Sequence, residues 1–253
     1  MSHLIKTEAE IEHIIHSGKI LASVLREIKK KVQPGVSLIE LDRQAENFIC
    51  LQGARPAFLG YKPDGAEHPY PNTICASVND VVVHGIPSGQ VLHDGDIVTI
   101  DIGVNWRGGF SDAAITVPVG NVSQEAKRLL VITKDALSAG IQAARGGNTL
   151  GDIGYAIEST ARRGHAYVIK GLTGHGVGLA VHEEPTVFNY GTPGAGMVLR
   201  SGMVLALEPM TSFGTSHVMQ KRDDSYATID GSISAHFEHT IIITDGESFV
   251  VTE

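Results

Sequence analysis

Two carboxylates lie near the ends of apolar segments, where an unpaired charge is costly to bury. Asp101 belongs to residues 91–103, VLHDGDIVTIDIG, and Glu208 belongs to residues 198–210, VLRSGMVLALEPM. Both segments begin with Val-Leu and carry a glycine at their fifth position. The same pattern twice, in register, indicates a duplicated fold that gathers carboxylates at its centre. Bound metal ions would neutralise such a cluster.

Two further matches extend the repeat. His84-Gly85-Ile86-Pro87 precedes the first segment as His182-Glu183-Glu184-Pro185 precedes the second, and Pro34–Leu38 is echoed by Gly146–Leu150. Three matches in one order predict an internal duplication with halves of roughly residues 1–122 and 123–253. Because no linker rich in proline, glycine or serine divides the halves, we expect one domain over residues 1–253.

Composition excludes several classes of protein. The 253 residues are 42% hydrophobic, which is typical of a globular chain, and the net charge of −8 predicts no nucleic-acid partner. No targeting or membrane-spanning segment is recognisable, so no membrane association is expected. The two cysteines make no disulfide framework, which favours a cytoplasmic location.

Hydrophobic spacing predicts helices that alternate with groups of strands. Capping boxes at Thr7/Glu10 and Ser37/Glu40 are expected to begin the first two helices, and the second helix is expected to run through Phe48. The later helices are expected over residues 124–144 and 150–163, and the strands over 73–83, 97–106, 113–119, 166–170, 174–181, 203–210 and 236–243. This order predicts an α+β domain in which two helix pairs cover one face of a curved antiparallel sheet.

A hairpin is expected to bring two of the acids together. The stretch between Asp101 and Asp112 turns at Arg107-Gly108-Gly109, so the paired strands would place both carboxylates on one face. Two negative charges at such a short distance repel each other, so a bound cation or a shared proton is needed. Asp112 could equally be a solvated residue beside the turn, because aspartate is common there.

His175 and Glu238 are further candidates for a metal site. Glycines flank His175 on both sides and would allow other groups to approach its ring closely. Glu238 precedes an apolar strand, and alternation places it on one face with His236 and Thr240. A structural histidine and a water-facing glutamate on an edge strand are the alternatives.

Seven motifs stand in a fixed order along the chain: HG at 84–85, DIG at 101–103, aspartate at 112, GHGVG at 174–178, HEEP at 182–185, LEPM at 207–210 and FEHT at 237–240. In these motifs the chain resembles type I methionine aminopeptidases over essentially its whole length. The resemblance implies the pita-bread fold with its internal pseudo-two-fold duplication. It also implies a hydrolase that removes the N-terminal methionine when the second residue is small.

The resemblance further implies a ligand set for two divalent metal ions: Asp101, Asp112, His175, Glu208 and Glu238. Charge agrees with this set, because two divalent cations would balance four carboxylates. One imidazole among oxygen donors suits Mn²⁺, Fe²⁺ or Co²⁺ better than a structural zinc site. Two cations about 3.5–4 Å apart can hold a bridging hydroxide and polarise a carbonyl.

The mechanism expected from this resemblance is attack of that bridging water on the first peptide carbonyl. The substrate amine would bind one metal and the carbonyl oxygen the other. Glu208 would accept the proton, His182 would donate a hydrogen bond to the oxyanion, and His84 would contact the scissile nitrogen. No Gly-x-Ser-x-Gly motif or cysteine-protease signature offers a nucleophilic side chain instead.

The methionine pocket is expected to include Phe58, Tyr61, Tyr70 and Cys75 beside the two catalytic histidines. Several positions depart from the family pattern: Phe58 replaces a frequent cysteine, Val181 replaces a usual phenylalanine, residues 62–69 form an extra segment, and residues 211–230 lack a tryptophan. These departures affect the expected shape of the pocket and leave the expected metal ligands intact.

Rival interpretations are an Xaa-Pro dipeptidase or creatinase relative, and a metal-free binding protein on the same scaffold. Xaa-Pro dipeptidases and creatinases usually carry an additional N-terminal domain. A metal-free binding protein would have other residues in place of the metal ligands. The expected partners are N-termini of nascent polypeptides, reached at the ribosome. We expect the protein to be a monomer.

Overall fold

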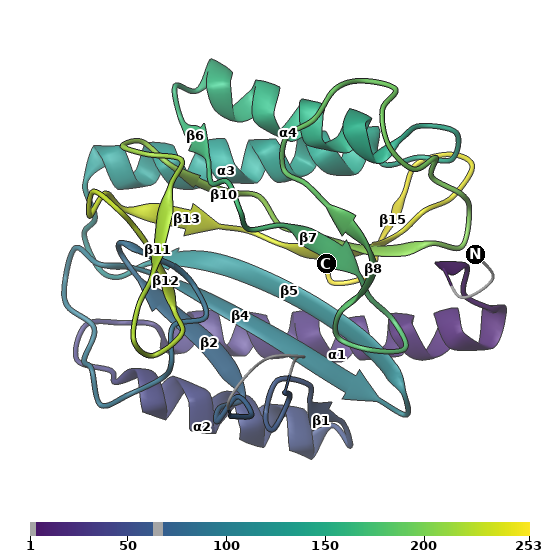
Figure 1. The fold of residues 1–253 in the computed structure, drawn as a ribbon. Coiled ribbons are helices and arrows are strands. Elements are labelled where there is room, and N and C mark those ends of the chain that lie inside the picture. Colours follow the sequence, from purple (N-terminus) through teal and green to yellow (C-terminus); the bar gives the residue numbers. More distant parts are fainter. Residues whose placement is uncertain (1–3, 63–67) are drawn as a thin grey trace.

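Two pairs of helices pack against the strands (Figure 1). The computed structural model describes residues 4–62 and 68–253. Its helices are α1 (Glu8–Lys31), α2 (Leu38–Leu51), α3 (Gln124–Ala143) and α4 (Leu150–Arg163). In Figure 1, α1 and α2 lie below the strands and α3 and α4 lie above them.

The strands also divide between the two halves of the chain. The first half contains β1 (Arg55–Pro56), β2 (Ile74–Val78), β3 (Val81–Val83), β4 (Ile97–Trp106) and β5 (Gly109–Pro118). The second half contains β6 (Tyr167–Val168), β7 (Gly174–Gly176), β8 (Glu183–Val187), β9 (Val204–Leu207), β10 (Met210–Ser212), β11 (Val218–Gln220), β12 (Tyr226–Thr228), β13 (Ser234–His236), β14 (His239–Ile242) and β15 (Phe249–Val250).

Every strand pairing among the described residues is antiparallel, as predicted. The first half forms the order β1-β4-β2 with β5 on β4, and the second half forms β15-β14-β9-β7-β8. β5 lies against β13 and β14, so the two half-sheets meet along this seam. One main-chain hydrogen bond across the seam runs from the Glu238 nitrogen to the Ala114 oxygen, at 2.9 Å.

The predicted duplication is visible in equivalent hydrogen bonds. Ser37 forms an isolated antiparallel bridge with Val91, and Thr149 forms the same bridge with Val198. These are the helix starts and segment starts that the sequence repeat aligns. The flanking backbone bonds correspond as well: Leu38 to Gln90, Leu92 to Val36, Leu150 to Met197 and Leu199 to Asn148.

Several predicted boundaries need correction. The capping box at Thr7 is present, but Ser37 makes no side-chain cap, and its helix runs to Leu51 rather than Phe48. Three of the predicted strands are each divided: 73–83 into β2 and β3, 203–210 into β9 and β10, and 236–243 into β13 and β14. The predicted strand over 174–181 is only three residues long, and β5 begins before residue 113.

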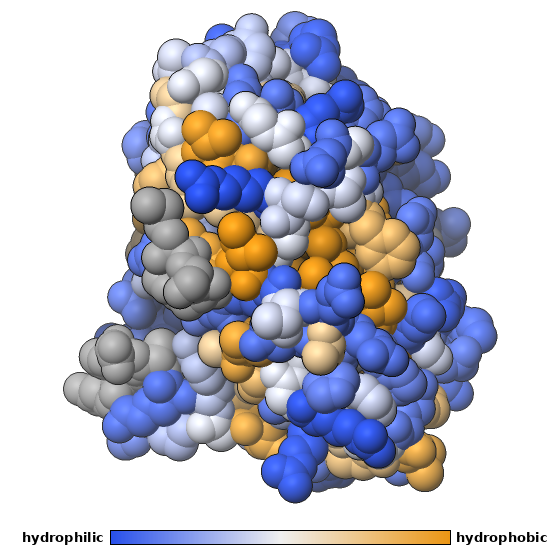
Figure 2. All heavy atoms as spheres, turned by 90° about the vertical axis from the view of Figure 1, so that its right-hand side faces the viewer, coloured by the Kyte–Doolittle hydropathy of each residue, from blue (hydrophilic) through white to orange (hydrophobic). Residues whose placement is uncertain are grey.

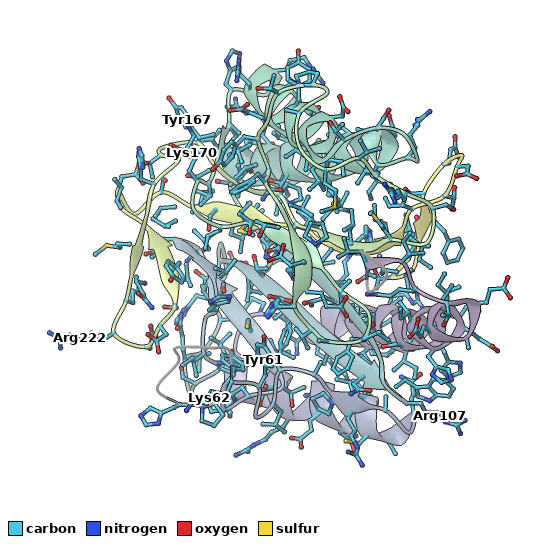
Figure 3. All side chains as sticks on the ribbon, turned by 45° about the vertical axis from the view of Figure 1, so that its right-hand side comes forward. Tyr61, Lys62, Arg107, Tyr167, Lys170 and Arg222 are labelled. Atoms are coloured by element: carbon cyan, nitrogen blue, oxygen red, sulfur yellow. The ribbon has the colours of Figure 1, made fainter. Side chains whose placement is uncertain are left out.

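Each half has its own apolar core against its helix pair. One core packs α1 and α2 on β2, β4 and β5, and the other packs α3 and α4 on β9, β13 and β14. Ile115 of β5 contacts both cores. Arg107 and Arg222 project from the tips of the β4–β5 and β11–β12 hairpins (Figure 3). No helix in the described residues is long and apolar enough to cross a membrane.

Candidate metal centre

The five predicted ligands come from five different segments that meet at the seam. Asp101 lies in β4, Asp112 in β5, His175 in β7, Glu208 between β9 and β10, and Glu238 between β13 and β14. Their side chains fall into groups whose potential ligand atoms lie within 4.8 Å of one another: Asp101, Asp112 and Glu238; and His175, Glu208 and Glu238. A third such group joins Asp112 and His175 to His182.

The β4–β5 hairpin places the two aspartates as predicted. In its register Asp101 is opposite Ala114 and Asp112 is opposite Gly103, so the carboxylates are diagonal neighbours on one face. The turn residues Arg107 and Gly108 have φ values of 51° and 85°, as a type I′ turn requires. The alternative of a solvated Asp112 is wrong, because this residue is 3% exposed.

The two glutamates occupy the breaks that divide the long strands. Leu207 pairs with His239 on one side of the break and Met210 pairs with His236 on the other, which leaves Glu208 and Glu238 facing each other outside the ladder. Pro209 has no N–H to continue that ladder. Because the ladder is interrupted here, the side chains of Glu208 and Glu238 can point toward the seam.

His175 presents one ring nitrogen to the acids. Its Nδ1 lies 2.8 Å from the Gly176 carbonyl and can donate to it, which leaves the Nε2 lone pair 3.4 Å from Glu208 and 3.9 Å from Asp112. Burial lowers the pKa of His175 to about 4, so the ring is neutral at pH 7. A neutral imidazole held through its second nitrogen is the usual state of a metal-bound histidine.

The glycines beside His175 permit this approach. A Cβ at Gly174 would lie 2.4 Å from the Ala206 oxygen, and one at Gly176 would lie 2.1 Å from the Glu184 oxygen. No side chain fits at either position. The glycines thus allow the neighbouring backbone to lie close to residues 174 and 176.

The acids cannot all ionise without a compensating charge. Removal from water raises the pKa of Asp101 to about 7. Removal from water and the neighbouring acids raise the pKa values of Asp112, Glu208 and Glu238 well above their usual range. Within residues 4–62 and 68–253, one oxygen each of Asp101, Asp112 and Glu238 is buried without a hydrogen-bond partner. Unpaired carboxylate oxygens around a free imidazole nitrogen fit divalent cations.

His182 lies at the edge of this cluster and is exposed. Its ring is 4.4 Å from that of His175, and its Nδ1 is 3.0 Å from the hydroxyl of Tyr61, which Figure 3 labels. Partial removal from water, and then the neighbouring His175 and His84, lower the pKa of His182 below its usual value. The ring is therefore neutral and can donate only one hydrogen.

A buried ion pair supports the loop before His182, and the sequence did not indicate it. The Glu183 carboxylate pairs with Lys6 and accepts a hydrogen bond from the Ala180 nitrogen at 2.8 Å. Lys6 lies 177 positions away in the chain, so no local pattern could reveal the pair. The N-terminal segment thus contributes to the position of His182.

His84 lies just after β3 with a φ of 59°, and its ring meets Tyr226 edge to face at 5.9 Å. Phe58, Cys75 and Val181 form one apolar cluster with Ala57, Tyr70 and Phe110 packed against it. Cys75 pairs with Asp101 in the β2–β4 register, which places this cluster beside the acids. Tyr61 lies outside the cluster, and residues 63–67 of the extra segment lie outside the described residues.

His236 is a buried neighbour of the acids that the sequence analysis grouped with Glu238 but did not assign to the site. Its Nε2 lies 3.7 Å from Glu208 and 3.8 Å from Glu238. Alternation along the strand carried the signal. A histidine at this position could equally be a structural residue of the core. Only its tertiary contacts decide between a structural role and a role in the site.

Comparison with known proteins agrees with this geometry. The model of "Metallopeptidase family M24" matches residues 12–245. Methionine aminopeptidase 1 of Bacillus subtilis is 44% identical over 241 residues, with 95% of each chain covered. The crystal structure of methionine aminopeptidase from Rickettsia prowazekii superposes with a TM-score of 0.94 at 39% identity, covering 98% of this chain and 99% of that one.

A prolidase from Pyrococcus furiosus shares the fold at a TM-score of 0.79 and 23% identity, but this chain covers only 65% of it. The architecture common to these structures is the pita-bread fold. The chain belongs to metallopeptidase family M24. Within that family it belongs to the methionine aminopeptidases, as the resemblance to type I members predicted.

Proposed function

We propose that the chain removes the N-terminal methionine from polypeptides whose second residue is small. The observation that carries this proposal is the buried group of four carboxylates and one neutral imidazole, in a chain similar to methionine aminopeptidases over 95% of its length. Asp101, Asp112, His175, Glu208 and Glu238 would hold two divalent metal ions. The ions would polarise the scissile carbonyl and lower the pKa of water.

Glu208 is the proposed proton acceptor. Asn189 fixes its main chain by donating to the Glu208 carbonyl oxygen at 3.0 Å, while its carboxylate faces both His175 and His236. When the ions compensate the charge of the acids, this carboxylate ionises and can take a proton from the attacking water. The proton can then pass to the departing amine.

His182 is the proposed donor to the oxyanion. The Tyr61 hydroxyl can donate to Nδ1, which leaves the single ring hydrogen on Nε2. The nearby His175 ring places this donor beside the acid cluster. His84, held against Tyr226, would contact the scissile nitrogen.

The methionine side chain would occupy the apolar cluster of Phe58, Tyr70 and Cys75. Methionine is unbranched and polarisable, so it suits an irregular aromatic lining. The Tyr70 hydroxyl donates to the Ile74 carbonyl at 2.9 Å, so this polar group has a partner although it lies beside Cys75 of the cluster. Tyr61 would contact the substrate through its position beside His182.

All 253 residues are proposed to form one catalytic domain, because Asp101 and Asp112 come from the first half and the other three ligands from the second. The proposed state is a monomer; on the face shown in Figure 2, apolar side chains form patches divided by hydrophilic ones. Nascent polypeptides are the proposed substrates, met at the ribosome, and they imply a cytoplasmic location.

A peptide panel tests the proposal. Metal-loaded protein should release methionine from Met-Ala-Ser much faster than from Met-Leu-Ser, and should leave Ala-Pro-Ser uncut. Equal cleavage of the two methionyl peptides would contradict the requirement for a small second residue. Cleavage of Ala-Pro-Ser without preference for methionine would favour the dipeptidase alternative.

A further inference from the structure

The two ring nitrogens of His236 have no role in the proposed mechanism. The residue is 1% exposed, and neither nitrogen of its ring has a hydrogen-bond partner among the described residues. A buried polar group of this kind requires an explanation. Two carboxylate oxygens lie close to the ring: Oε2 of Glu208 is 3.7 Å from Nε2, and Oε2 of Glu238 is 3.8 Å from Nε2.

The surroundings of the ring determine which nitrogen carries the hydrogen. A neutral imidazole has one N–H. Among the described residues, the carboxylates within 4 Å of this ring are those of Glu208 and Glu238, and both face Nε2. The Nδ1 atom has no partner to receive a hydrogen. The hydrogen therefore belongs on Nε2, where it points toward the two acids.

The backbone of His236 is held in place from the other half of the molecule. The Thr116 hydroxyl donates to the His236 carbonyl and accepts from its amide, each at 2.8 Å. Thr99 completes the chain of hydroxyls at 2.8 Å from Thr116. These bonds fix the His236 main chain, from which the side chain projects, before any ligand binds.

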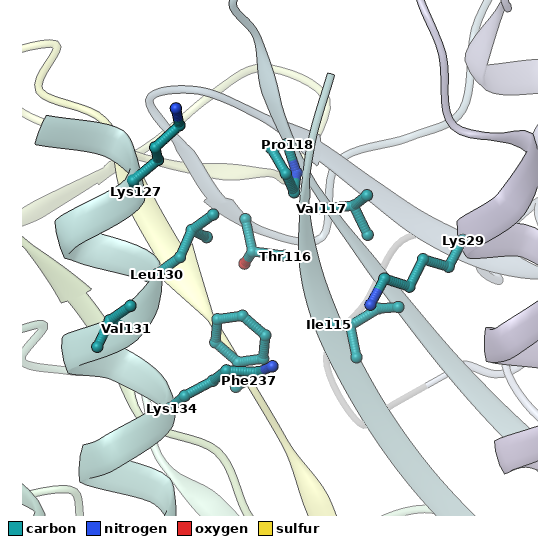
Figure 4. A pocket seen from close by; sticks show the side chains of 10 residues that line it. All are labelled: Lys29, Ile115, Thr116, Val117, Pro118, Lys127, Leu130, Val131, Lys134 and Phe237. Carbon is teal, nitrogen blue, oxygen red and sulfur yellow. The ribbon is translucent and has the colours of Figure 1, made fainter. Parts of the chain in front are cut away.

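The neighbouring residue confirms that direction. Phe237 points to the helix side, into a groove of about 310 Å³ between α3, α1 and β5, together with Lys134 of α3 (Figure 4). Consecutive residues in extended backbone face opposite ways. Because the Phe237 side chain lies in the groove, the His236 side chain points the opposite way, toward the acids.

We propose that His236 is a positioning residue for the metal centre, donating its Nε2 hydrogen to Glu208 or Glu238 and fixing the orientation in which these carboxylates bind metal. The present distances exceed a hydrogen bond by about half an ångström, which a small rotation of either carboxylate removes. Ligating carboxylates are generally held by such outer hydrogen bonds. This inference rests on the proposed metal ligands and concerns a residue outside that set.

Metal titration of three variants tests the inference. His236→Leu keeps a buried side chain of similar size but has no donor, and should weaken Mn²⁺ binding by about 10- to 100-fold in calorimetry. His236→Gln retains an N–H donor and should recover most of the affinity. His239→Leu is the matched control: its ring bonds to Thr252 at 2.9 Å, away from the acids, so metal affinity should not change.

The Co²⁺-loaded variants provide a second readout. If His236 acts through the glutamates, the visible absorption of bound Co²⁺ in His236→Gln should match that of the wild type, because no ligand is lost. Wild-type affinity in a folded His236→Leu variant would overturn the inference. Equal loss of affinity in His236→Leu and His236→Gln would also overturn it, because the donor would then not be the determinant. Absence of metal binding in the wild type would instead refute the proposed function.

Discussion

The unfolding free energy of the metal-free protein should fall progressively as the pH rises above 7. In the folded metal-free state, the pKa values of Asp112, Glu208 and Glu238 are raised well above their usual range. In the unfolded chain these acids are ionised above about pH 5. A group with a raised folded pKa stabilises the fold below its unfolded pKa, and this contribution is lost as the pH rises through the folded pKa.

The choice of pH window follows from the histidines of the site. The pKa values of His175, His182 and His236 fall to about 4, 3 and 3, so below about pH 6.5 the unfolded chain binds protons that these rings do not. Their contribution increases with pH and opposes that of the acids. Above about pH 7.5 the unfolded imidazoles are nearly all deprotonated, so the histidine contribution is close to complete and the acids dominate the slope.

The expected size of the effect follows from linkage. Each proton that the folded acids retain lowers the unfolding free energy by about 1.4 kcal/mol per pH unit. A single retained proton thus amounts to about 2 kcal/mol between pH 7 and 8.5. Bound metal should remove this slope, because the ions bind the ionised carboxylates.

Urea denaturation of chelated and Mn²⁺-loaded protein at pH 7, 7.5, 8 and 8.5 measures both slopes. Glu238→Gln is the matched variant, because it removes one acid and should flatten the slope of the chelated protein. A metal-free protein whose unfolding free energy stayed constant or increased over this range would refute the assignment of raised pKa values to the cluster.

Three further outcomes are expected. His182→Ala should lower kcat by about 10²–10³ with near-normal KM and metal content, since the lost hydrogen bond forms in the transition state; a lower melting temperature with unchanged kcat would mean a structural role. His175→Ala should weaken metal binding first, as elemental analysis after dialysis would show, and full retention of metal would exclude it as a ligand. Gly176→Ala should destabilise the fold by on the order of 3 kcal/mol in urea denaturation, because its Cβ would meet the Glu184 oxygen at 2.1 Å; wild-type stability would show that the backbone yields there.

The sequence predicted those parts of the fold that local patterns determine. The β4 strand and α4 have the predicted bounds, and the Thr7 capping box forms because all its atoms lie within one turn. The same pattern at Ser37 gives no side-chain cap, and the backbone of Ser37 instead bridges to Val91, a contact set by the rest of the half.

The strand breaks at Glu208 and Glu238 were not predicted, because apolar alternation continues through both positions. They depend on Pro209 and on the bond from the Glu238 nitrogen to Ala114 across the seam. Tyr61 was expected in the methionine pocket. Its contact with His182 spans 121 positions of sequence, which no local pattern could indicate.

The residues brought to the seam were nonetheless recognisable from the sequence, because buried charge is rare and the duplication repeats it. Asp101 and Glu208 occupy matching positions of the two halves, and the structure groups each with the other predicted acids. Alternation grouped His236 with Glu238 but assigned it no role, because a lone histidine on a buried face has no distinctive spacing.

The most direct test of the account is the dependence of activity on metal. Chelated protein, verified as metal-free by elemental analysis, should release no methionine from Met-Ala-Ser, and activity should return as Mn²⁺ or Co²⁺ is added back. Full activity of the verified metal-free protein would contradict the assignment of the carboxylate cluster as a metal centre.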